Sequence, residues 1–173
     1  MKSVFVFLFL SVSIIAAPKK LLVVGQKPDG HPPGTHEYMP GARVVKALLV
    51  GRDDVEVTIA QADEPWTEGP KLIAKADGIV LFVNEGGRFI ADDPKRAKAF
   101  EAFAKRGGGL VVYHWGMGAK KVEHVGPFLK LFGGCHGGPD RKYTVVKEAK
   151  FQVASPRHPV MAGIKSFELP FEE

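Results

Sequence analysis

Three short stretches of the sequence combine side chains that could carry out acid–base chemistry or bind a metal. They are His36–Glu37, Asn84–Glu85 and His114–Trp115. Imidazole and carboxylate groups can transfer protons near neutral pH, and they are also common ligands of zinc. We therefore take these pairs as the first candidates for a functional site.

His114 stands in the most unusual context. The segment GGGLVVYHWGMG, residues 107–118, has a glycine cluster, a short apolar run, and an imidazole followed closely by two more glycines. In α/β proteins, a strand that ends abruptly in a reactive side chain flanked by glycines is typical of a nucleophile elbow. Here the side chain is an imidazole rather than a hydroxyl or a thiol. Because this is a poor way to pack a core, we favour a functional role for His114.

The surrounding pattern predicts the elements that would position these side chains. Apolar runs predict strands over residues 21–24, 55–59, 79–83 and 110–113, and helical spacing predicts helices over 41–50, 71–75, 94–106 and 122–132. This alternation indicates an α/β fold with three layers and a mostly parallel, flavodoxin-like sheet. Ligands of such sheets bind outside the carboxyl ends of the strands. The three pairs should therefore meet at one edge.

The later part of the chain is less regular. Residues 133–138 are so rich in glycine that we expect a loop, which carries Cys135 and His136. Residues 143–146 are a candidate strand, and Phe167 and Leu169 suggest another. A lone cysteine beside glycines is more often a small buried residue than a nucleophile.

Composition and charge limit the classes of protein. The 173 residues, 45% of them hydrophobic, suit one globular domain. The formal net charge of +5 comes from scattered basic residues, which argues against a nucleic-acid partner. Self-association into a homo-oligomer stays open.

The first 16 residues predict a signal peptide. A positive start at Lys2 is followed by an apolar stretch over 4–15 and by the small residues Ala16 and Ala17. That stretch is too short to span a bilayer comfortably. We therefore expect an exported protein, periplasmic or extracellular, with no integral membrane segment after cleavage and a mature domain over residues 18–173.

Three kinds of site remain open at this point. A divalent, zinc-like ion could be held by His36, His114 and His136, with Glu37 as a further donor, although their spacing matches no short zinc motif. Metal-free acid–base chemistry would use an imidazole and a carboxylate. A binding site without catalysis would stack Trp115 and Tyr38 on a sugar.

The sequence resembles the ThuA-like (trehalose-utilisation) family of the class I glutamine amidotransferase-like superfamily. The resemblance rests on GTHEY (34–38), GIVLFVNEGG (78–87), the block from Asp92 to Gly118, FLKLFGGCHGGPDRKY (128–143) and SPRHPVMAGIKSFEL (155–169). In the superfamily's amidotransferases, the strand matching residues 110–113 delivers a catalytic cysteine. Here that position is His114, so the resemblance does not imply glutamine hydrolysis.

The resemblance implies an exported protein of carbohydrate metabolism that acts on a sugar, a disaccharide or a 3-keto-sugar by hydrolysis or isomerisation. We expect His114, His36 and Glu37 as catalytic residues, and a substrate-binding set of Trp115, Tyr38, Asn84, Glu85, His136 and Asp140. The alternative is a sugar-binding accessory module without catalysis. Members usually continue beyond the segment that ends this chain, so the domain is expected to be incomplete at its C-terminus.

Overall fold

The computed structural model describes residues 16–142, 144 and 146–169. These residues form two compact units that divide between Pro139 and Asp140, and each is described by itself. The predicted signal peptide and the last four residues of the chain lie almost entirely outside the described residues. Within the described part of the chain, no helix is long and apolar enough to cross a membrane.

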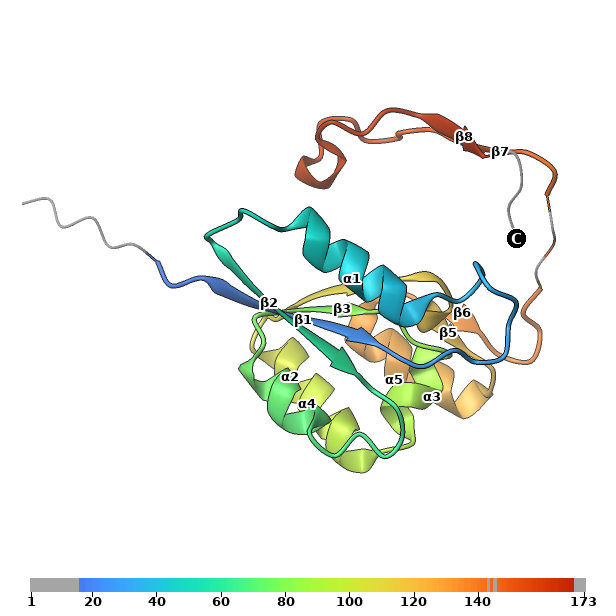
Figure 1. Cartoon of the computed structure of the whole chain (residues 1–173). Coiled ribbons are helices and arrows are strands. Elements are labelled where there is room, and N and C mark those ends of the chain that lie inside the picture. Colours follow the sequence, from blue (N-terminus) through green and yellow to red (C-terminus); the bar gives the residue numbers. More distant parts are fainter. Residues whose placement is uncertain (1–15, 143, 145, 170–173) are drawn as a thin grey trace, which may run out of the picture. The chain divides into compact units, whose positions relative to one another are not determined.

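A parallel four-stranded sheet forms the centre of the first unit (Figure 1). Its strands, in the spatial order β2-β1-β3-β4, are β2 (Val55–Gln61), β1 (Lys19–Gly25), β3 (Gly78–Leu81) and β4 (Gly109–Val112). Every neighbouring pair is parallel. The predicted flavodoxin-like sheet is confirmed, and its two central strands carry fully buried residues such as Val24 and Leu81.

Helices cover both faces of this sheet and complete the three layers. They are α1 (Tyr38–Leu48), α2 (Gly69–Lys75), α3 (Gly86–Ala91), α4 (Pro94–Lys105) and α5 (Val122–Phe132). On the α1 face, Ala42 packs with Val23 and Val80 in a small core cluster. The α2, α3, α4 and α5 helices lie on the other face (Figure 1), where the larger cluster includes Phe100 and Phe128.

The helix starting at Pro94 follows directly from its sequence. The Asp93 carboxylate accepts hydrogen bonds from the backbone N–H groups of Lys95 and Arg96, which have no partner inside the helix. Proline suits the first turn because it lacks the N–H that would be left over there. This start and the inward direction of Phe100 and Phe103 agree with the sequence pattern.

Some short elements lie where the sequence predicts none. Helix α3 begins with two glycines, so its sequence does not show the spacing of apolar residues that predicts a helix. Strand β5 (Gly118–Ala119) pairs in parallel with β6 (His136–Gly137), so the predicted loop over 133–138 contains a strand. Two residues are too few to show the alternation that predicts a strand.

In the second unit, β7 (Ala149–Phe151) pairs antiparallel with β8 (Phe167–Leu169), and a short 3₁₀ helix, η2 (Pro159–Met161), lies between them in sequence. The rings of Phe151 and Phe167 stack 4.9 Å apart. The strand suggested by Phe167 and Leu169 is confirmed. The candidate strand over 143–146 falls partly outside the described residues.

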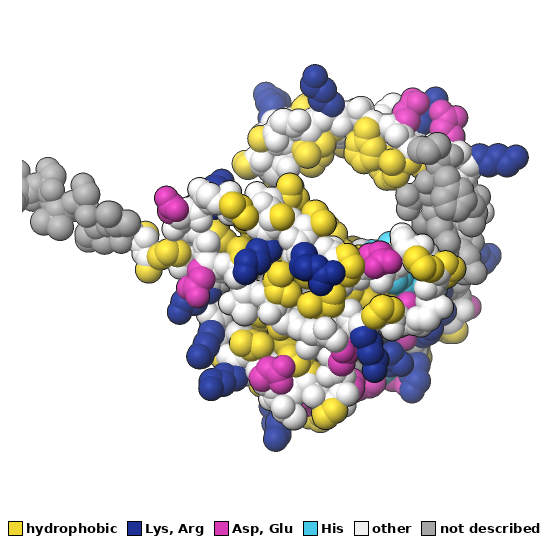
Figure 2. Space-filling view, viewed as in Figure 1, with side chains coloured by type: hydrophobic (Ala, Val, Ile, Leu, Met, Phe, Trp, Pro, Cys, Tyr) yellow, Lys and Arg dark blue, Asp and Glu magenta, His cyan; other side chains and the backbone are white. Residues whose placement is uncertain are grey.

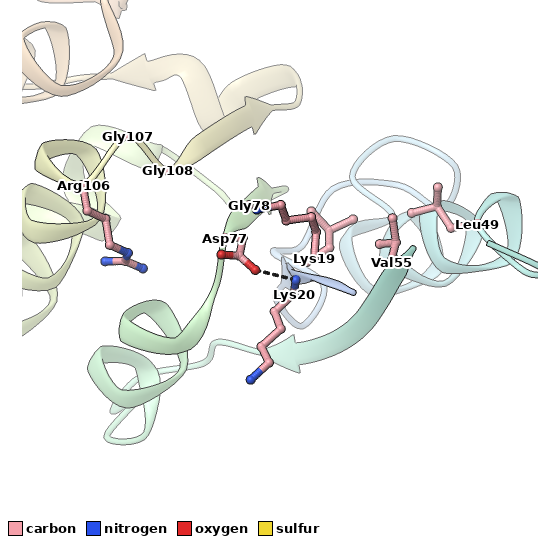
Figure 3. A pocket seen from close by; sticks show the side chains of 10 residues that line it. Lys19, Lys20, Leu49, Val55, Asp77, Gly78, Arg106, Gly107 and Gly108 are labelled. Carbon is pink, nitrogen blue, oxygen red and sulfur yellow. Dashed lines mark hydrogen bonds between the residues drawn. The ribbon is translucent and has the colours of Figure 1, made fainter. Parts of the chain in front are cut away.

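The surface of the first unit agrees with the scattered charge of the sequence. On the face shown in Figure 2, basic side chains lie among acidic and apolar ones and form no continuous patch. A hollow of about 520 Å³ lies at the amino ends of the strands and is lined by residues such as Lys20, Asp77 and Arg106 (Figure 3). Its location is at the opposite end of the sheet from the predicted site.

Candidate functional site

One glutamine connects the chain segments that leave three strands. The Gln26 amide nitrogen donates to the carbonyl of Ala62 at 3.3 Å, and its Oε1 accepts from the backbone N–H of Asn84 at 2.8 Å. Gln26 follows β1, Ala62 follows β2 and Asn84 lies beyond β3. The loop from Gln26 to Glu37 therefore starts from a point fixed to the carboxyl edge of the sheet.

Asp29 is the centre of a polar cluster on that loop. Its Oδ1 lies 2.7 Å from His31 Nδ1, and its Oδ2 lies 2.7 Å from His36 Nδ1 and accepts from the Tyr38 hydroxyl at 2.8 Å. The side chains of Asp29 and His36 are only 11% and 9% exposed, whereas His31 is 51% exposed. Asp29 is not among the candidate residues that the sequence pattern indicates.

The hydrogen bonds in this cluster change the acidity of two groups. Partial burial by itself would raise the pKa of Asp29, but hydrogen bonds from His36, Tyr38 and His31 outweigh it and hold the pKa well below its usual range. Burial, and then the hydrogen bond to the Asp29 carboxylate, raise the pKa of Tyr38 well above its usual value. Asp29 is therefore an anion at neutral pH, and Tyr38 keeps its proton.

The structure brings His36 and His114 together. Their ring centroids are 5.0 Å apart and the rings meet edge to face, and the ring centroids of His31 and His36 are 4.0 Å apart. An anionic carboxylate, a first imidazole and a second imidazole thus follow one another at the carboxyl ends of β1 and β4. The predicted meeting of these two segments is present in the structure.

His114 occupies a strained turn. Strand β4 ends at Val112, and a short 3₁₀ helix, η1 (His114–Met117), begins at His114 with a φ of 50°. Positive φ is uncommon for residues other than glycine and costs of the order of 1–3 kcal/mol. The side chain is exposed at this turn. The backbone therefore has the sharp strand-to-helix turn that the sequence pattern indicates.

Glu85 has the same backbone strain but the opposite environment. Its φ is also 50°, yet the residue is only 3% exposed. Oε1 accepts from the backbone N–H of Lys120 at 2.7 Å, and Oε2 lies 3.7 Å from Arg88 Nε. These contacts direct the Glu85 carboxylate into the protein. They therefore do not support the predicted role of Glu85 in binding substrate.

Two further predicted residues have structural contacts. Glu37 is exposed, and its Oε1 accepts from the backbone N–H of Gly34 at 2.8 Å, which closes the loop on itself. Tyr38 is 1% exposed, and its ring meets that of Phe82 edge to face at 5.1 Å. A ring so deeply buried cannot serve as a stacking surface for a sugar, so its contribution is the hydroxyl that orients Asp29.

The other aromatic candidate forms a separate pair. Trp115 is partly buried, and the ring of the exposed His136 meets it edge to face, with the centroids 5.9 Å apart. The structure thus pairs His136 with Trp115, and it pairs His36 with His114. Asp140 is exposed at the start of the second unit, and its predicted role stays a prediction.

The donors that could hold a metal differ in part from the predicted set. Among the described residues, one group of three has its ligand atoms all within 4.8 Å of one another, and it consists of Asp29, His31 and His36. His36 belongs to both sets. The sequence signal that could have identified Asp29 is its Asp-x-His spacing with His31.

Cys135 contacts the main core rather than this group. It is partly buried against the larger core cluster. Burial raises the pKa of the Cys135 thiol, so the thiol is neutral at neutral pH. A neutral thiol is a weak nucleophile.

Comparison with known proteins identifies the family. The family model for ThuA, described as trehalose utilisation, matches residues 20–173. A solved ThuA-like protein from Bacteroides uniformis has the same fold, with a TM-score of 0.65 at 20% sequence identity over 94% of this chain. The present chain spans 62% of that protein's length. A comparison with curated proteins finds no match. The chain belongs to the ThuA family, which associates it with carbohydrate metabolism.

Proposed function

We propose that this protein is exported and acts on a sugar, a disaccharide or a 3-keto-sugar, by hydrolysis or isomerisation, with His114 as the acid–base group. The observation that carries the proposal is the series Asp29, His36 and His114, with a 2.7 Å contact between the first two and a ring separation of 5.0 Å between the last two. Family membership supports the carbohydrate substrate.

The contacts assign a role to each member of this series. Because Asp29 is ionised, it can only accept, so the His36 Nδ1 must carry the proton in their hydrogen bond. This leaves Nε2 as the basic nitrogen of His36. Asp29 and Tyr38 therefore fix the orientation of His36, and His36 can influence the charge of the adjacent His114. His114 is exposed and can meet a substrate.

Trp115 and His136 supply an aromatic surface near this turn. Aromatic rings bind the apolar faces of sugars, and Trp115 follows His114 directly in η1. Glutamine hydrolysis is a poorer proposal. The residue at the predicted elbow is His114, and Cys135 is neutral and packed against the core.

The test is turnover of a panel of sugars by His114→Ala. Trehalose, other disaccharides and their 3-keto derivatives would be incubated with the purified protein, and the products would be quantified by chromatography. We expect a loss of about 10²–10⁴-fold in kcat. The matched control is His158→Ala, which removes an exposed histidine of the second unit. Unchanged turnover in His114→Ala would rule out the assigned role.

The same panel tests the alternative of a binding module. Sugar binding by calorimetry without turnover, with Trp115→Ala weakening the binding, would favour a module that binds without catalysis. Export has its own test. Mass spectrometry of protein recovered outside the cytoplasm should show a chain that begins after Ala16.

A further inference from the structure

We infer that Asp29, His31 and His36 bind a divalent transition-metal cation such as Zn²⁺. The three side chains offer one carboxylate oxygen and two imidazole nitrogens, all within 4.8 Å of one another. Two histidines and one carboxylate are a common ligand set for catalytic zinc, with a further position left open for water or substrate. The inference goes beyond the proposed function, because a cation can bind whether or not a sugar is converted.

The same nitrogen of both imidazoles is directed to the carboxylate. His31 Nδ1 and His36 Nδ1 each lie 2.7 Å from a different oxygen of Asp29. Without a cation, each ring can donate a hydrogen bond from Nδ1–H to the carboxylate. With a cation, each ring can move that proton to Nε2 and offer the Nδ1 lone pair instead. Both imidazoles then stay neutral, and no proton has to leave the site.

The two contacts between histidine and carboxylate are shorter than a bound ion requires. For metal–ligand bonds of about 2.0–2.1 Å, tetrahedral geometry separates neighbouring ligand atoms by about 3.3 Å. The present contacts of 2.7 Å would therefore have to open by about half an ångström. His31 can make this movement, because its side chain is 51% exposed and it follows Gly30, a residue without a side chain that restricts the backbone.

Tyr38 provides the support that a metal ligand usually has. Its hydroxyl donates to Asp29 Oδ2 at 2.8 Å, and its ring is buried against Phe82. Groups that bond to a ligand in this way fix its orientation, and their loss typically weakens metal binding about 10–100-fold. A hydrogen bond from a rigid, buried ring is a strong constraint on the carboxylate.

The proposed metal site lies beside His114, so a bound cation could take part in the same chemistry. The ring of His36 contacts the ring of His31 and also that of His114, so it links the proposed metal ligands to His114. This part of the inference rests on the proposed function: with the cation bound, His36 acts as a ligand and His114 remains the acid–base group beside it. The cation would polarise a sugar oxygen or a water molecule.

The experiment measures the metal content and affinity of the full chain. Chelator-treated protein would be titrated with Zn²⁺ by calorimetry and with Co²⁺ by visible absorption, and the variants Asp29→Asn, His31→Ala and Tyr38→Phe would be compared. His136→Ala is the matched control, because it removes an exposed histidine that contacts Trp115 instead. We expect one equivalent of metal in the wild type and in His136→Ala.

The variants should differ in a graded way. His31→Ala and Asp29→Asn should lose at least 100-fold in affinity, and Tyr38→Phe about 10–100-fold. In nitrogen NMR spectra, Zn²⁺ should move the proton of two histidines from Nδ1 to Nε2. Absence of stoichiometric binding, or binding that His136→Ala abolishes and His31→Ala leaves intact, would overturn the inference.

Metal binding and turnover can fail separately. His114→Ala should retain full metal affinity, because His114 is not one of the three donors. If this variant binds Zn²⁺ normally and no sugar is converted by the wild type, the proposed function fails and the metal site stands. If the wild type converts sugar at full rate without binding any metal, the metal site fails and the proposed function stands.

Discussion

Two turns of the molecule share a positive φ and differ in the environment of the side chain. Glu85 follows the end of β3 and His114 follows the end of β4, and both have a φ of 50°. The Glu85 carboxylate is buried and bonded to Lys120 N–H, whereas the His114 side chain is exposed beside His36. Backbone strain alone therefore does not identify a reactive residue. The environment of the side chain does.

The two turns are also in direct contact. Gly86 is buried next to Glu85, and a Cβ atom at that position would overlap the carbonyl oxygen of Gly116 in η1. This close approach fits a structural role for the turn at Glu85, which packs against the turn that carries His114. Variants in each turn can therefore separate support from chemistry.

His114→Gly should give the largest effect of all, and on activity alone. Turnover should fall about 10²–10⁴-fold because the acid–base group is missing. The free energy of unfolding should change by less than about 1 kcal/mol, since relief of the positive φ offsets the added flexibility of glycine. Steady-state kinetics and denaturant unfolding would measure the two quantities. A large loss of stability would show that His114 is a packing residue.

Gly86→Ala should destabilise the first unit by roughly 3 kcal/mol, because the new methyl group has no space against Gly116. Activity should fall as well, because the turn that holds His114 must move. The control is Gly126→Ala in α5, where a Cβ meets open space and the change should stay within about 1 kcal/mol. Equal stability of the two variants would contradict the described contact.

Glu85→Ala should cost about 1–3 kcal/mol of stability, since the Lys120 N–H would lose its acceptor in a partly buried setting. Glu85→Gln keeps an oxygen at the same place and should recover most of the loss. Thermal and denaturant unfolding would rank the three proteins. If Glu85→Ala retained its stability and lost sugar affinity, the carboxylate would be a substrate contact.

Modification of Cys135 should have the smallest effect. Burial raises the pKa of this thiol, so at pH 7 the thiolate fraction is lower than for an ordinary cysteine, and it increases as the pH rises. Iodoacetamide should react slowly, as followed by mass spectrometry, and turnover should persist. Rapid inactivation at neutral pH would point to thiol chemistry instead.

The fold could be predicted well from the sequence because its signals are long. Each strand of the central sheet coincides with an apolar run, and helices such as α4 show helical spacing with a clear N-terminal cap. Helix α3 and strands β5 and β6 are too short to show either pattern. The rule that ligands bind at the carboxyl ends of strands located His36 and His114 at the same edge.

The direction of individual side chains could not be predicted in this way. The loop carrying Asp29 has no regular period, so the sequence does not indicate that this carboxylate lies between two imidazoles. Tyr38 and Glu85 looked available to a ligand because both stand beside other polar residues. The structure buries both, since Tyr38 begins a helix that packs on the sheet and Glu85 bonds to Lys120.

The bridge made by Gln26 has a consequence for how this protein could diversify. Its side chain connects the segments leaving β1, β2 and β3 at the start of the loop. Residues between Lys27 and Glu37 could be replaced, lengthened or shortened without shifting the sheet beneath them. Exchange of that loop would remove Asp29, His31 and His36 together and would leave the turn that presents His114 in place.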